Sequence, residues 1–180
     1  MARGITVEFD KLVKLYGLPD SDDIMEMNVD YIGETYAQVH KAALREALDD
    51  EMDDDAAEAY AEEKAQKAEQ ETSDEVYRTY VGAVESAVET TMGHANIDVE
   101  LKKDGKWHIT PQKSWEDSAK KIVEILNGVG MFHFSSLREF LDSGPYTARE
   151  AVEKHLGVTA DYAEVYGDSS PKRLYERAWR

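Results

Sequence analysis

The chain has 180 residues, no cysteine, and a formal net charge of -17 from 38 acidic and 21 basic residues. The absence of cysteine excludes disulfides, thiolate catalysis and cysteine-based zinc sites. The negative charge argues against direct binding to nucleic acid or to anionic membranes, because both repel it. No run of 18 apolar residues predicts a membrane span, and the N-terminus lacks a signal-peptide pattern, so we expect a soluble, cytoplasmic protein.

The first fifty residues predict one strand followed by helices. Apolar residues alternate over residues 4–9, which indicates a short strand with one buried face. Asp10 is expected to cap a short helix that ends at Gly17. A second short helix is expected over residues 21–27. From about Tyr31 the apolar residues recur three or four apart, which predicts a long helix.

Residues 46–75 are the most unusual stretch, with fourteen acidic residues and only two lysines. The composition there favours helix. Residues 49–55, however, carry like charges three and four positions apart, so we expect a frayed or bent segment at that point. The capping-box spacing of Thr72 and Glu75 predicts that a new helix begins at Thr72, and Gly93 is expected to end it.

Two alternating segments, residues 97–102 and 106–110, predict a β-hairpin. A three-residue loop with Gly105 in the left-handed conformation would pair Leu101 with Trp107 and place the apolar side chains of both strands on one face. Together with the N-terminal strand, this hairpin predicts a three-stranded antiparallel sheet covered by helices.

The C-terminal part predicts three capped helices, beginning after Ser114, Ser136 and Thr147, of which the first is expected to end at Gly128. Residues 147–166 resemble a helix-turn-helix. A recognition helix presents arginine, lysine, asparagine or glutamine to bases, whereas the second helix of this segment would present acids. The segment is therefore expected to serve in packing rather than in reading DNA.

The predicted fold class is α+β, predominantly helical, with a small antiparallel sheet and a long acidic helical segment. Residues 1–128 are expected to form one lobe that carries the acidic segment. Residues 129–180 are expected to form a small helical lobe. A single domain for the whole chain is left open.

No arrangement of residues predicts catalysis. The five histidines lack metal-binding spacing, and no glycine-rich loop suited to phosphate is present. Asp49, Glu51, Asp53 and Asp55 resemble the alternating ligands of a calcium loop, but Asp54 stands where that loop requires glycine. We therefore expect no enzyme, no cofactor and no dedicated metal site.

The acidic stretch predicts a binding function. Carboxylates three and four apart on a helix lie about 5–6 Å from one another, and phosphates of one DNA strand advance about 3.4 Å per nucleotide. We expect a non-enzymatic inhibitor that occupies the basic cleft of a nucleic-acid-binding protein by mimicry, of the anti-restriction or anti-CRISPR type of phages and mobile elements, in the host cytoplasm. The expected contact residues are Asp49, Asp50, Glu51, Asp53, Asp54, Asp55, Glu58, Glu62, Glu63, Asp74 and Glu75.

Two other functions stay open. The chain could be an acidic assembly, scaffold or chaperone-like module that oligomerises or binds a basic protein, or a helix-turn-helix regulator. For the inhibitor and for the assembly or chaperone-like module, the expected partner is a basic protein. A homodimer is left open. A generally halophilic surface is disfavoured, because residues 97–121 and 172–180 are mildly basic.

Overall fold

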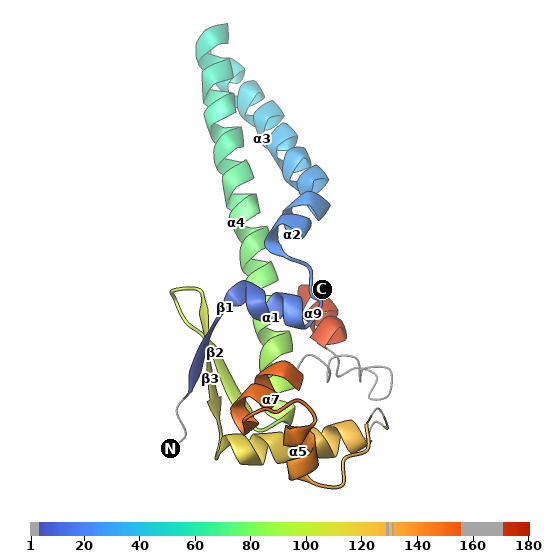
Figure 1. Cartoon of the computed structure of the whole chain (residues 1–180). Helices are drawn as coiled ribbons and strands as arrows, with labels where there is room; N and C mark the ends of the chain where they lie inside the picture. The colour runs from blue at the N-terminus through green and yellow to red at the C-terminus, as the bar shows by residue number, and fades with distance from the viewer. Residues whose placement is uncertain (1–3, 129, 131, 156–170) are drawn as a thin grey trace. The chain divides into compact units, whose positions relative to one another are not determined.

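The computed structural model describes residues 4–128, 130, 132–155 and 171–180 (Figure 1). Contacts divide the chain into unit 1, Met1–Pro19 with Gly82–Arg180, and unit 2, Asp20–Val81. The fold is predominantly helical α+β with one small antiparallel sheet, as predicted. The expected boundary between two lobes near residue 129 falls inside unit 1, and that division stays a prediction.

Unit 1 contains a three-stranded antiparallel sheet in the order β1–β3–β2. Its strands are β1 (Ile5–Glu8), β2 (Ile97–Leu101) and β3 (Lys106–Pro111). Leu101 lies opposite Trp107, which confirms the predicted register. Gly105 has φ of +76° and its N–H donates to the carbonyl of Lys102 at 3.0 Å, so the three-residue loop is also confirmed.

One face of this sheet is buried and the other is exposed. The buried face carries Ile5, Val7, Trp107 and Ile109, and the exposed face carries Thr6, Glu8, His108 and Thr110. The ring of Trp107 stacks on Phe9 with centroids 5.5 Å apart, and its Nε1–H donates to the Phe9 carbonyl at 3.2 Å. This alternation follows from the side-chain period of two in a strand.

Helices cover the buried face of the sheet in unit 1 (Figure 1). The helices that the structure describes in unit 1 are α1 (Phe9–Leu15), the last part of α4 (Asp54–His94), α5 (Trp115–Gly128), α6 (Leu137–Asp142), α7 (Ala148–His155) and α9 (Pro171–Trp179). Hydroxyls of Ser114, Ser136 and Thr147 accept hydrogen bonds from backbone N–H groups three residues later, which confirms the predicted caps. The second helix of the helix-turn-helix pattern lies outside the described residues.

The beginning of α1 differs from the prediction. Strand β1 passes directly into α1, so Glu8, with an extended backbone, occupies the N-cap position and no side chain caps the helix. Asp10 therefore lies within the first helical turn, and the prediction that it caps the helix is wrong. Gly17, which follows the C-cap Tyr16, has φ of +62°, as expected for a helix stop.

Unit 2 consists of α2 (Ser21–Met27), α3 (Val29–Asp49) and the first part of α4. The side chains and backbone N–H groups of Asp20 and Asp23 form a capping box at the start of α2. The two long helices are joined by residues 50–53 and run side by side (Figure 1). They are antiparallel, because a four-residue connection leaves no length for a parallel return.

Helix α4 runs without interruption, so the predicted new helix at Thr72 is wrong. The hydroxyl of Thr72 donates to the carbonyl of Ala68 at 2.8 Å inside the helix and is not available as a cap. The prediction that Gly93 ends the helix is also wrong. The helix ends one residue later, and Asn96, a residue type that tolerates the left-handed region, has φ of +56°.

The interface between α3 and α4 is made largely of alanine. Ala57, Ala61 and Ala65 on α4 are completely buried, and Ala43 and Ala47 on α3 are almost so. Small side chains allow two helices to approach closely. Each buried methyl group contributes only about 0.8 kcal/mol of hydrophobic stabilisation, so polar contacts beside this alanine seam carry weight. Among the helices of the described residues, none has the length and apolarity needed to cross a membrane.

Candidate acidic interaction surface

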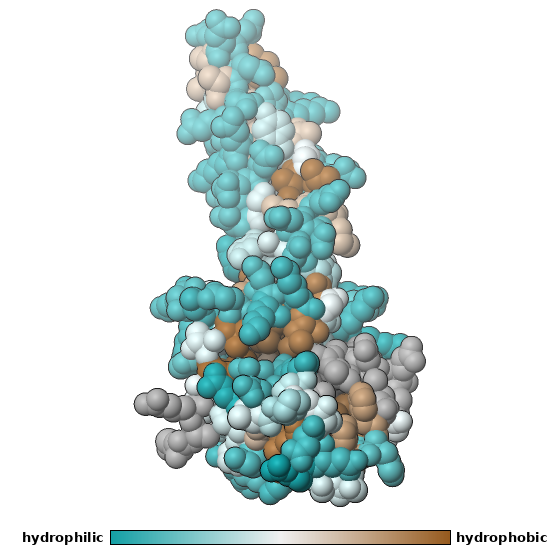
Figure 2. Space-filling model, in the orientation of Figure 1, coloured by the Kyte–Doolittle hydropathy of each residue, from teal (hydrophilic) through white to brown (hydrophobic). Residues whose placement is uncertain are grey.

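The acidic tip, which we define as residues 49–63, comprises the end of α3, the connection and the first turns of α4. The interruption expected over residues 49–55 is present, because α3 ends at Asp49 and α4 begins at Asp54. Hydrophilic residues dominate the visible surface of unit 2 (Figure 2). The tip thus brings together acids from the end of α3, from the connecting loop and from the start of α4.

The connection contains a residue with an unusual backbone conformation. Glu51 has φ of +62°, its N–H donates to the carbonyl of Leu48 at 3.2 Å, and the N–H of Met52 donates to Ala47 at 3.1 Å. These are the two hydrogen bonds of a Schellman motif, in which the left-handed position is usually glycine. A glutamate at this position is therefore conformationally unfavourable.

Acids at the two helix ends have opposite effects on helix stability. The side chain of Asp53 accepts a hydrogen bond from the N–H of Ala56 at 2.9 Å and so caps α4. Asp54 and Asp55 follow in the first turn, where the helix dipole favours negative charge. Asp49, in contrast, lies in the last turn of α3, where the dipole disfavours it.

The predicted contact residues remain open to solvent. All eleven are exposed except Glu62, which is partly buried. Within the part of the chain that the structure describes, none of the eleven forms an ion pair with a lysine or arginine. Two basic side chains of the described residues lie near them: the Nε2 of His40 is 3.2 Å from Glu58 and 3.9 Å from Glu62, and Lys64 interacts electrostatically with Glu63 without forming an ion pair.

The acids of α4 share one side of the helix over its first ten residues. At about 100° per residue, Asp54, Asp55, Glu58, Glu62 and Glu63 span about half of the circumference. Asp74 falls within about 20° of the direction of Glu63, whereas Glu75 turns about 100° further away. Asp74 therefore lies on the same side of α4 as the predicted contact acids, whereas Glu75 does not.

Tyr36 and His40 of α3 meet two of these acids beside the alanine seam. The hydroxyl of Tyr36 donates a hydrogen bond to Glu62, and the rings of Tyr36 and His40 stack with centroids 5.9 Å apart. This hydrogen bond, followed by one from Gln66, lowers the pKa of Glu62, while the same bond raises the pKa of Tyr36. Glu62 is thereby held in its charged form.

A second pair of contacts lies between the helices. The hydroxyl of Tyr60 on α4 donates to Glu46 on α3 at 3.4 Å, and the ammonium group of Lys64 lies 5.0 Å from the centre of the Tyr60 ring. Sequence reasoning missed Tyr36, His40 and Tyr60 as neighbours of the acids. The i,i+4 spacing of Tyr36 and His40 placed them on one helix face, but nothing in the sequence indicated which acids that face meets.

Within residues 4–128, 130, 132–155 and 171–180, no group of three or more histidine, aspartate or glutamate side chains is arranged to hold a metal ion. Comparison of the chain with models of protein families, with curated proteins and with solved structures gave no match.

Proposed function

We propose that the acidic tip occupies the basic nucleic-acid-binding cleft of another protein and inhibits it by mimicry of a nucleic-acid backbone. The observation that carries this proposal is the exposure of the acids without ion pairs to lysine or arginine in the described residues. Acids that a protein neutralises internally would offer a basic cleft little electrostatic gain. Here the carboxylates keep their charge available for a partner.

The spacing of the acids supports this proposal. Residues 54–63 rise about 14 Å along α4 at about 1.5 Å per residue, which matches about four phosphate steps of one DNA strand. The end of α3 and the loop add Asp49, Asp50 and Glu51 next to this row. A cleft that releases counterions when it binds a phosphate backbone would release them to this surface in the same way.

Two of the acids occupy positions that helix stability does not explain. Asp49 lies where the dipole of α3 disfavours negative charge, and Glu51 adopts a conformation that favours glycine. A chain that needed acids only for solubility has many exposed positions without these penalties. Their concentration at the α3–α4 connection supports a binding role for this part of unit 2.

The experiment is a pull-down from nuclease-treated bacterial lysate with the tagged chain, at low and high salt. The expected outcome is retention of basic proteins that high salt or added duplex DNA releases. The triple variant Asp53→Asn, Asp54→Asn and Asp55→Asn should weaken binding of the captured protein by about three- to a hundredfold, since each exposed ion pair contributes about 0.2–1 kcal/mol. Asparagine also caps helices well, so α4 should stay intact.

A matched control removes the same charge elsewhere in unit 2. Glu26→Gln, Asp30→Asn and Glu34→Gln replace three exposed acids of α2 and α3 that lie outside the acidic tip. This control should bind like the natural chain. Equal weakening by both triple variants would reduce the effect to net charge, and retention that DNA does not disturb would contradict mimicry.

One observation favours a second candidate, an assembly or chaperone-like module that binds a basic protein. Leu48 and Met52 are 46% and 42% exposed beside the acids. A cleft built for phosphates has no need of apolar contacts, whereas a protein partner gains from burying them. The double variant Leu48→Ser and Met52→Ser should leave binding intact under mimicry and abolish it for such a module.

A further inference from the structure

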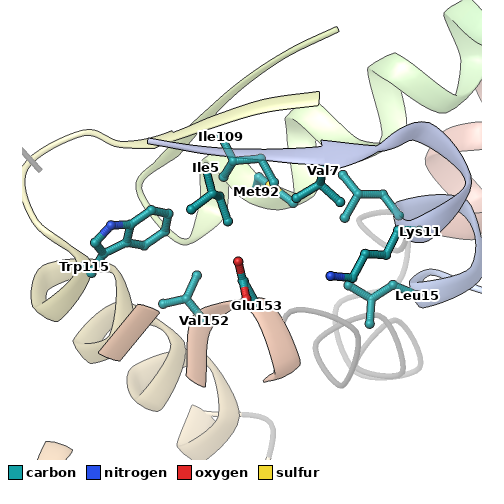
Figure 3. A pocket seen from close by; sticks show the side chains of 10 residues that line it. Ile5, Val7, Lys11, Leu15, Met92, Ile109, Trp115, Val152 and Glu153 are labelled. Atoms are coloured by element: carbon teal, nitrogen blue, oxygen red, sulfur yellow. The ribbon is translucent and has the colours of Figure 1, made fainter. Parts of the chain in front are cut away.

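Unit 1 contains an apolar cavity of about 60 Å³ that is separate from the acidic tip (Figure 3). Ile5, Val7 and Ile109 from the sheet form one wall, and Trp115 of α5 and Val152 of α7 form another. All five side chains are buried in the fold. The lining residues come from β1, β3, α1, α4, α5 and α7, so two strands and four helices of unit 1 must be in place to form this space.

The size of the cavity limits what can enter it. One water molecule requires about 10–15 Å³ of such a cavity. The cavity therefore has room for about four or five non-hydrogen atoms. Because its walls are apolar, water gains few hydrogen bonds there, and an apolar group of that size would fill it better.

Two opposite charges border the cavity. Figure 3 shows the side chains of Lys11, from α1, and Glu153, from α7, both extending into the space. No ion pair joins these two side chains, although both are described in the structure. Glu153 interacts instead with Arg149, one turn earlier on α7, at 3.7 Å.

We propose that this cavity binds a free α-amino acid with a short aliphatic side chain, such as leucine or valine. The side chain enters the apolar space, the carboxylate meets Lys11, and the ammonium group meets Glu153. An α-amino acid carries an ammonium group, a carboxylate and an apolar side chain on one carbon. These three groups complement the anion, the cation and the apolar space that meet at this cavity. The three or four carbons of valine and leucine side chains fit the volume.

The test follows the side-chain methyl signals of Ile5, Met92 and Val152 by NMR while ligands are added to the full chain. Leucine and valine should shift these signals saturably, and glycine should not. 4-Methylpentanoate, which lacks the ammonium group, and 3-methylbutylamine, which lacks the carboxylate, should each bind about tenfold more weakly or worse. No saturable shift with leucine, or equal binding of either analogue, would overturn the proposal.

Variants at the two charges separate the assigned contacts from general electrostatics. Lys11→Met and Glu153→Gln should each weaken leucine binding about tenfold, and Lys11→Arg should retain most of it. Lys14→Met and Glu116→Gln change exposed charges of the same two signs outside the cavity lining and should bind leucine normally. Unchanged binding in Lys11→Met and Glu153→Gln, or equal loss in the controls, would refute the assignment.

Discussion

The hydroxyl of Tyr36 on α3 donates a hydrogen bond to the carboxylate of Glu62 on α4, beside the alanine seam that joins the two helices. This contact links an aromatic residue of α3 to one of the predicted contact acids. The hydrogen bonds from Tyr36 and Gln66 lower the pKa of Glu62, so this carboxylate stays ionised to a lower pH than an ordinary glutamate. The same acid thus supports the pairing of α3 with α4 and contributes charge to the acidic tip.

Replacing Tyr36 with phenylalanine should lower the thermal midpoint of unfolding by a few degrees at neutral pH and raise the pKa of Glu62 toward its ordinary value. A lowered carboxyl pKa contributes stability above the unfolded pKa and loses it as pH falls through the folded pKa. A raised tyrosine pKa loses its contribution as pH rises through the folded value. Melting curves of Tyr36→Phe and of the natural chain from pH 3 to 9 should therefore converge at the acid end, as the pH falls through the lowered pKa of Glu62.

The matched control for this variant is Tyr31→Phe, because Tyr31 lies on the same helix and is exposed. Its melting curve should follow that of the natural chain at every pH. A difference between Tyr36→Phe and the natural chain that persists unchanged at pH 3 would show that packing of the ring, and not the bond to ionised Glu62, causes the loss.

Replacing Glu51 with glycine should stabilise the chain by about 1 kcal/mol, because only glycine adopts φ near +62° without steric cost. Hydrogen exchange of the amides at the end of α3 would report this as slower opening. Glu51→Ala removes the carboxylate and keeps the backbone strain, so it should show no such gain. If both variants stabilised the chain equally, relief of charge repulsion would be the cause instead.

Asp53 combines a capping role with a predicted contact role, and two substitutions separate them. Asp53→Ala should cost about 1 kcal/mol of stability, because the N–H of Ala56 loses its acceptor. Asp53→Asn should keep the stability and lose only the charge. Chemical unfolding measures the first effect and affinity for a captured partner measures the second. Equal stability of the two variants would show that the cap contributes little to α4.

The sheet could be predicted in detail because period-two patterns and turn chemistry constrain each other. With Gly105 in the loop, one register alone put Leu101 and Trp107 on the same face as the other apolar residues. The break between α3 and α4 was predictable from like charges over residues 49–55. Both features depend on residues close together in the sequence, where local rules apply.

The failures arose where tertiary packing overrode a local signal. Thr72 has the spacing of a capping box, but it is buried, on the same side of α4 as Val76 and Ala65, and packing keeps the helix continuous. The side of α4 that faces α3 could not be predicted, because alanines occur on every side of this helix between residues 56 and 68. Because the side of α4 that faces α3 was unknown, the acids that lie on its exposed side could not be identified.

The last prediction concerns the alanine seam between α3 and α4. Ala61 is completely buried between α3 and α4, whereas Ala59, two residues earlier on α4, is exposed. Replacing Ala61 with leucine adds three carbons at a completely buried position of α4, which should destabilise unit 2 by about 1–3 kcal/mol. Ala59→Leu adds the same side chain on the open side and should change stability by no more than about 0.5 kcal/mol.

Hydrogen exchange resolved by residue distinguishes these variants, because it reports opening of α3 and α4 separately from the sheet of unit 1. In Ala61→Leu, exchange should accelerate over residues 29–65 and stay unchanged at Trp107 and Ile109. The variant should also weaken binding of a captured basic partner, since displaced helices no longer hold the acids in one row. Full affinity together with accelerated exchange would mean that the acids act as independent charges, and a surface of fixed geometry would then be the wrong description of the tip.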